Sequence, residues 1–146
     1  MRALIRRAGS LWESITEPRH LKIAYLVIYL ITIAVGVVTL VKPPQSIEGP
    51  LGTATTMLWA GLFILGGLVG AVTVLPGWWW VERLLGIAPI FIGLAIYLAV
   101  VIVLHIHGLD AGASRLTQIG IILLASAPFT LRGLLIREYS YEPRRG

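Results

Sequence analysis

The chain has 146 residues, of which 57% are hydrophobic and only 13% are charged. Soluble proteins hold roughly 45–50% apolar and about 25% charged residues, so this composition excludes an ordinary soluble domain. The chain contains no cysteine, which excludes a disulfide framework, a thiolate metal site and a thiol nucleophile.

Four long apolar runs, at 21–41, 54–75, 84–104 and 116–136, occupy most of the chain. Each approaches or reaches the ~20 residues with which an α-helix crosses ~30 Å of hydrocarbon. None shows the alternation of apolar and polar residues that marks a barrel strand. We therefore predict an all-α integral membrane protein, in which residues 1–146 form one membrane domain built on a four-transmembrane-helix bundle.

Basic residues are distributed unevenly around these runs. Ten of the 12 Lys and Arg residues precede the first run, separate the second from the third, or end or follow the fourth, and only Lys42 and Arg115 fall on the other side. Membrane proteins concentrate Lys and Arg in their cytoplasmic segments. We predict a multi-pass protein of the cytoplasmic (inner) membrane with both termini in the cytoplasm. Topology thus explains the net charge of +5, and we expect no nucleic-acid partner.

The N-terminal segment 1–17 is amphipathic. Leu4, Leu11, Trp12 and Ile15 recur at helical spacing, with charged and polar residues on the opposite side. This pattern predicts an interfacial helix that lies along the bilayer and attracts anionic lipid headgroups, although a solvated tail is the alternative. Residues 137–146 are predicted to form a short cytoplasmic tail.

Tryptophans gather at a predicted span boundary, where Trp78, Trp79 and Trp80 follow a Pro-Gly turn. Indole rings favour the membrane–water interface because their apolar face and their N–H group suit opposite sides of it. We interpret these three residues and Trp12 as interfacial anchors. An aromatic cage for a ligand is the alternative.

The second run is rich in glycine, with Gly61, Gly66, Gly67 and Gly70. Gly66 and Gly70 form a GxxxG pair, which lets two helices approach closely in lipid. These glycines are predicted helix-packing residues. They either mediate oligomerisation, giving a homo-oligomer, or pack against the other helices of the same chain.

Two prolines fall inside predicted spans, Pro89 in the third and Pro128 in the fourth. Each frees a carbonyl one turn earlier, so we predict helix kinks at both positions. A static kink and a hinge that opens a pore are the two interpretations.

Charged residues are scarce within the runs. Arg132 either extends its side chain to the cytoplasmic surface or forms an ion pair with Glu82 that lines a cytoplasmic vestibule. The apolar centres of the four runs argue against ion-coupled transport, because nothing there could bind a cation or relay a proton.

Catalytic and metal-binding patterns are absent from the sequence. His105 and His107 are two residues apart and so point to opposite sides of a helix, which does not suit a metal site. No Ser-His-Asp set, glycine-rich phosphate loop or HExxH pattern is present. We predict that the protein is not an enzyme and has no metal or cofactor.

The stretch PGWWWVERLLG at 76–86, set between a glycine-rich span and a proline-containing one, resembles a segment of small four-span membrane proteins of bacteriophages that infect actinobacteria. The basic tails fit the same group. Some of these proteins are described as holins, so the resemblance implies a phage origin and a holin-like role, with no catalytic residues.

These observations predict a holin-like protein that oligomerises and permeabilises the cytoplasmic membrane. A short chain, laterally associating apolar helices and charged cytoplasmic tails are what a holin requires. The alternative is a non-pore membrane interaction protein, either an accessory subunit that packs against a membrane protein partner or a phage exclusion or immunity factor.

Overall fold

The computed structural model describes residues 19–43, 45–108 and 114–141, with side chains at 20–43, 53–108 and 114–137. The predicted interfacial helix at 1–17, including Trp12, lies outside the described residues, as does 142–146 of the tail. All regular elements in the described ranges are helical. In chain order they are α2 (Arg19–Val41), α3 (Gln45–Val74), α4 (Trp79–Val81), the π-helical segment η1 (Glu82–Ile87), α5 (Ala88–Gly108) and α6 (Leu116–Tyr141).

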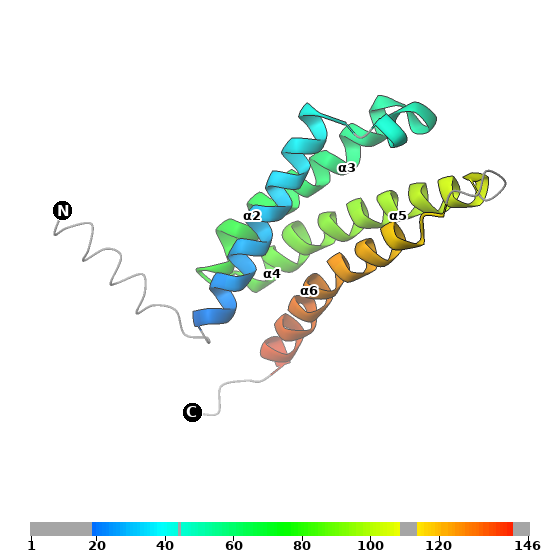
Figure 1. The fold of residues 1–146 in the computed structure, drawn as a ribbon. Helices are drawn as coiled ribbons and strands as arrows, with labels where there is room; N and C mark the ends of the chain where they lie inside the picture. Colours follow the sequence, from blue (N-terminus) through cyan, green and yellow to red (C-terminus); the bar gives the residue numbers. More distant parts are fainter. Residues whose placement is uncertain (1–18, 44, 109–113, 142–146) are drawn as a thin grey trace, which may run out of the picture.

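Four helical stretches are long and apolar enough to cross a membrane: His20–Val41, Thr53–Val74, Trp79–Gly108 and Leu116–Arg137. The prediction of an all-helical chain with four helices of spanning length is therefore confirmed. Their arrangement is two helical hairpins (Figure 1). Helix α3 packs against α2 on one side and against η1 and α5 on the other, while α6 packs against α5. Helices α2 and α6 are thus the outer members.

The boundaries differ from the predicted runs at two places. Helix α3 begins at Gln45 rather than near residue 54, and the third span begins at Trp79 rather than near residue 84. Apolar content marks the part of a helix that suits lipid and gives no signal where a helix continues through polar residues. Between α3 and α4 the chain turns at Gly77, whose φ of +76° favours glycine. The N–H groups of Gly77 and Trp78 both donate to the Thr73 carbonyl, which closes α3.

The third span contains a π-helical segment directly before Pro89. At its end the Ala88 N–H donates to the carbonyl of Arg83, five residues earlier, instead of four. A proline lacks the N–H of a regular helix and its ring crowds the carbonyl four residues earlier. The wider turn relieves that crowding. The second predicted kink residue, Pro128, lies inside α6.

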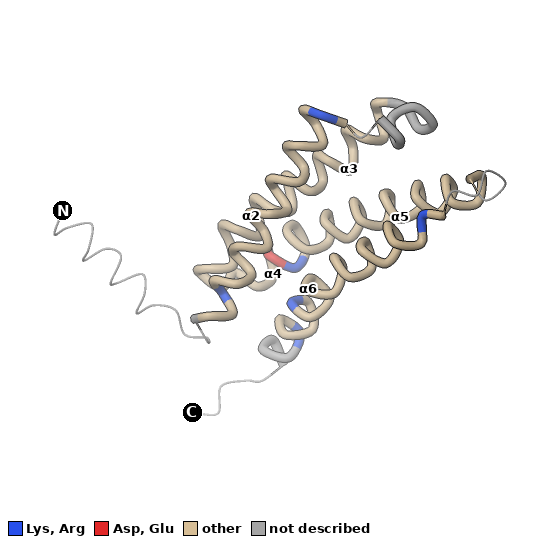
Figure 2. Tube along the Cα trace, viewed as in Figure 1, with Lys and Arg blue, Asp and Glu red and all other residues tan. Residues whose placement is uncertain are grey.

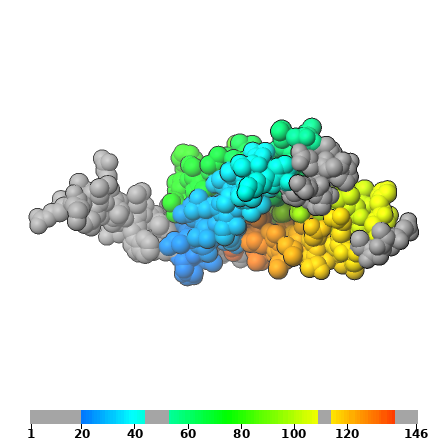
Figure 3. Space-filling view, turned by 45° about the horizontal axis from the view of Figure 1, so that its top comes forward, coloured from blue at the N-terminus to red at the C-terminus, as the bar shows by residue number. Residues whose placement is uncertain are grey.

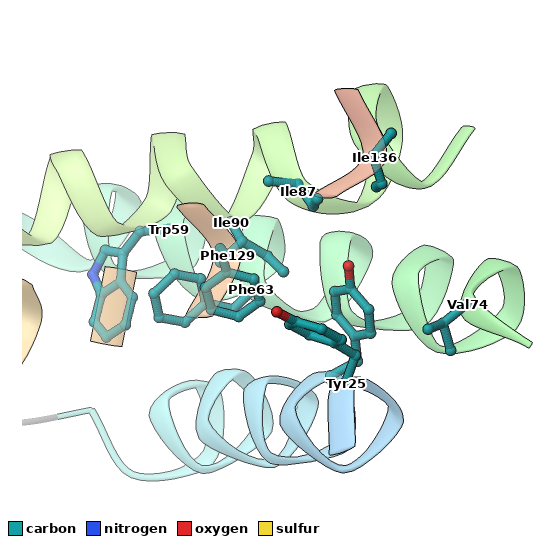
Figure 4. Close-up of a cluster of buried hydrophobic side chains, with 9 residues drawn as sticks. Tyr25, Trp59, Phe63, Val74, Ile87, Ile90, Phe129 and Ile136 are labelled. Carbon is teal, nitrogen blue, oxygen red and sulfur yellow. The ribbon is translucent and has the colours of Figure 1, made fainter. Parts of the chain in front are cut away.

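Aromatic side chains dominate the core between the helices (Figure 4). Trp59 contacts Phe63 edge-on, with ring centroids 5.4 Å apart, and stacks on Tyr97 at 5.0 Å. Tyr29 meets Phe129 at 6.0 Å and so links α2 to α6. Aromatic pairs at these separations add about 0.5–1.5 kcal/mol each to the effect of burial.

The glycines of α3 lie where neighbouring helices approach most closely. A Cβ at Gly66 would come within 2.6 Å of the Gly86 carbonyl oxygen, and one at Gly67 within 3.0 Å of the Tyr29 carbonyl oxygen. Gly70 lies against the ring of Tyr29. Gly61 differs, because a Cβ there would meet nothing within 4 Å. Three of the four predicted packing glycines therefore pack within the chain.

Gly66→Ala is expected to destabilise the fold by about 1–3 kcal/mol, because the added methyl meets backbone that cannot rotate away. Gly61→Ala is the matched control on the same helix and is expected to leave stability unchanged or slightly raised. Thermal unfolding of both variants in detergent micelles measures the difference. Equal melting temperatures for the two variants would contradict this packing.

Candidate functional site

A buried ion pair joins the third and fourth spans near the end of the bundle that holds α4 (Figure 2). Arg132 Nε donates to Glu82 Oε1 at 2.7 Å, and Arg132 Nη2 donates to Glu82 Oε2 at 2.8 Å. The guanidinium thus forms a two-point contact with the carboxylate, which is the strongest geometry for this pair. Glu82 is 0% exposed and Arg132 is 2% exposed.

Two tyrosines of α2 complete this cluster. The Tyr29 hydroxyl donates to Glu82 Oε1 at 2.8 Å. The ring of Tyr25 lies 5.0 Å from Arg132 Cζ, a cation–π distance. Tyr25 and Tyr29 are one helical turn apart, so both project from the same face of α2. We call Tyr25, Tyr29, Glu82 and Arg132 the charged cluster; it connects α2, η1 and α6.

Of the two sequence interpretations of Arg132, the structure contains the ion pair with Glu82 but not the open vestibule. The side chain does not extend to the surface, and the pair is enclosed by protein rather than lining an open vestibule. Removing two charges from water is costly, and only a close contact with further hydrogen bonds offsets that cost. Tyr29 supplies such a hydrogen bond. Among the side chains that the structure describes, Glu82 is the only acidic one.

A second buried cation lies at the same end. Lys22 is 3% exposed, and its Nζ donates to the carbonyl of Leu75 at 3.2 Å. Leu75 directly follows α3, where the last carbonyls of a helix lack partners within the helix. The positive charge of Lys22 also complements the negative end of the α3 dipole. This contact ties the start of α2 to the end of α3.

A pocket of 450 Å³ lies on the other side of Tyr29 and Phe129, between α2 and α6. The buried side chains of Trp59, Phe63 and Ile90 form its floor, whereas Ile31 of α2 and Ala125 of α6 are exposed at its rim. Figure 3 shows α2 and α6 along one face of the molecule. The full lining is Ile28, Ile31, Thr32, Val35, Thr39, Trp59, Phe63, Ile90, Leu94, Tyr97, Ile121, Ile122, Ala125, Pro128 and Phe129.

The lining of this lateral pocket is almost entirely apolar. Its two threonines direct their hydroxyls to their own helix: Thr32 donates to the Ile28 carbonyl and Thr39 to the Val35 carbonyl, both at 2.8 Å. These hydroxyls are therefore already engaged as donors. The pocket suits an apolar group and offers no cluster of polar groups for chemistry.

The remaining predicted residues lie apart from the pocket. Trp78 and Trp80 are 60% and 79% exposed, whereas Trp79 packs against the core. His105 Nδ1 accepts a hydrogen bond from the Arg115 backbone N–H, and a ring nitrogen of His107 lies 2.8 Å from the Val103 carbonyl oxygen. Within the described residues, no three His, Cys, Asp or Glu side chains are grouped to hold a metal ion.

Sequence reasoning missed the two tyrosines and Trp59. The four-residue spacing of Tyr25 and Tyr29 is the signal that could have indicated a shared polar face on an otherwise apolar helix. Trp59 carries no comparable signal, because a tryptophan inside an apolar run has the same appearance whether it faces lipid or a pocket. The chain matches no protein-family model, and searches of curated proteins and of solved structures find no significant match.

Glu82→Leu and Arg132→Leu are each expected to destabilise the protein by about 3–5 kcal/mol, because each leaves one buried charge without its partner. The double variant Glu82→Leu with Arg132→Leu removes both charges and is expected to be more stable than either single variant. Thermal unfolding in detergent micelles measures all three. Strictly additive losses would show that the two charges do not depend on each other.

Proposed function

We propose that the protein spans the cytoplasmic membrane four times, with both termini in the cytoplasm. Support comes from the four spanning helices and from their exposed apolar side chains, such as Val38, Val72 and Leu124. The distribution of the basic side chains between the two ends of the bundle supports the proposed orientation. Lys22 lies near the start of α2, Arg83 in η1 and Arg137 near the end of α6, whereas Lys42 follows α2 and Arg115 precedes α6. These positions are at opposite ends of the bundle, and Figure 2 shows Lys and Arg at both ends.

Ser114→Cys is expected to react with a membrane-impermeant thiol reagent added to intact cells, because Ser114 is exposed at the end with Lys42 and Arg115. His20→Cys, exposed at the opposite end, is expected to react only after the cells are permeabilised. The natural chain has no cysteine, so the background is clean. Labelling in the reverse order would refute the proposed orientation.

For the function itself, we propose a non-pore membrane interaction protein that acts through lateral contacts within the bilayer. One observation carries this choice over a pore. Gly66, Gly67 and Gly70 are already covered by the chain's own helices, so the GxxxG face is not available to a second copy unless the bundle opens. The charged cluster also keeps its polar groups inside one bundle, where Glu82 and Arg132 satisfy each other.

A holin-like pore is the second candidate, and a different set of glycines favours it. Gly61, Gly120 and Gly133 have open space where a Cβ would lie. Small residues on an exposed helix face allow close packing between chains in lipid. A homo-oligomer built through these positions would leave each four-span bundle intact.

Inducible expression in a bacterium, with membrane potential and optical density followed together, distinguishes the two functions. The interaction protein is expected to leave both unchanged. Gly66→Leu, which we expect to misfold, controls for the load that any overproduced membrane protein places on the cell. Depolarisation by the natural chain but not by Gly66→Leu would refute the non-pore function. If Gly120→Leu then failed to depolarise the membrane, oligomerisation through the exposed glycines would be indicated.

A further inference from the structure

The lateral pocket has the dimensions of a site for one hydrocarbon chain. Its volume of 450 Å³ holds about 15 groups of roughly the size of a water molecule, such as methylenes. A transmembrane helix about 10 Å wide and 30 Å long occupies roughly 2,400 Å³. The pocket therefore cannot enclose a helix of a partner protein or of a second copy, although it can enclose a single chain.

The length of the pocket points to the same occupant. Its lining on α2 runs from Ile28 to Thr39, a rise of about 16 Å at 1.5 Å per residue. One leaflet contributes half of the ~30 Å hydrocarbon core, which is about 15 Å. A single acyl chain that extends through its own leaflet therefore matches the pocket in length as well as in volume.

The two ends of the pocket differ in a way that orients this chain. At the inner end, Tyr29 and Phe129 close the space, and the charged cluster lies beyond them. Past the other end, Lys42 follows Thr39 on α2 and Arg115 precedes α6. Beyond this end of the pocket, each of the two helices is thus flanked by one cation, and a lipid phosphate is attracted to such cations.

We propose that the lateral pocket between α2 and α6 binds one acyl chain of an anionic phospholipid from the leaflet on the Lys42 side, with the headgroup near Lys42 and Arg115. The inference rests on the proposed membrane insertion and names a partner for the proposed lateral contacts. The terminal methyl of the chain lies toward Phe129. Apolar contacts hold the chain, and the two cations select the charge of the headgroup.

Photo-crosslinking in vesicles tests this site. The full chain is reconstituted in dioleoyl phosphatidylcholine with a trace of phosphatidylglycerol that carries a diazirine in mid-chain, and adducts are mapped by mass spectrometry after illumination. We expect several-fold more adducts at Ile31, Val35 and Ile121 than at Leu65 and Val72, which are exposed on α3 outside the pocket. Equal adduct densities would overturn the proposal.

Two alanines of α6 provide the matched variants. Ala125→Phe fills the pocket from its rim, whereas Ala127→Phe adds the same bulk at an exposed position outside the lining. Adducts at Ile31 and Val35 are expected to fall several-fold in Ala125→Phe and to stay unchanged in Ala127→Phe. Equal losses of adducts in both variants would overturn a lipid occupant. Pocket adducts that disappear as the protein-to-lipid ratio rises would also overturn it, in favour of contact with a second copy of the chain.

The headgroup preference is tested with a phosphatidylcholine probe of the same chain. The phosphatidylglycerol probe is expected to give at least twice as many pocket adducts, and Lys42→Gln with Arg115→Gln is expected to equalise the two. Equal adducts in the natural chain would overturn the anionic selection. Membrane potential is recorded separately: depolarisation would refute the non-pore function, whereas an unlabelled pocket would refute only the lipid site.

Discussion

The contact between Glu82 and Arg132 is the interaction on which the arrangement of the outer helices depends. A buried guanidinium needs an anion, and Glu82 is the only acidic residue whose side chain the structure describes. This requirement brings α6 against η1, and the Tyr29 hydroxyl and Tyr25 ring then draw α2 to the same point. Apolar contacts have no direction, whereas this cluster fixes which turn of each helix meets the others.

The lateral pocket follows from the way the cluster joins α2 to α6. The two helices meet through long side chains, Tyr25 and Tyr29 on one and Phe129 and Arg132 on the other, rather than by close backbone packing. Tyrosine and arginine hold the backbones apart. Further along, Thr32 and Val35 of α2 face the gap together with the small Ala125 of α6, and these side chains are too short to fill it. The space is thus a consequence of the charged cluster.

Part of this architecture is legible in the sequence, because long apolar runs and scarce charges are strong signals. The length of an apolar run predicts a spanning helix, and the pairing of Glu82 with Arg132 is accessible because so few charges compete for either partner. The extension of α3 to Gln45, the π-helical segment before Pro89 and the partners of Gly66 and Gly70 depend on packing between helices. Apolar residues that face lipid and apolar residues that face a neighbour are the same residue types, so composition cannot assign them.

The same ambiguity explains why the pocket escapes sequence reasoning while the pairing of Glu82 with Arg132 does not. A pocket forms where the surrounding side chains are too small to fill the space between helices. Small residues such as Ala125 or Val35 give no local signal in the sequence of the space beside them. A glutamate in an apolar segment does signal, because its burial must be compensated. In a chain of apolar helices, buried charges therefore carry the clearest information on packing. They identify the helices that meet, and the size of the side chains beyond the meeting point then determines whether the gap between those helices is filled or left open.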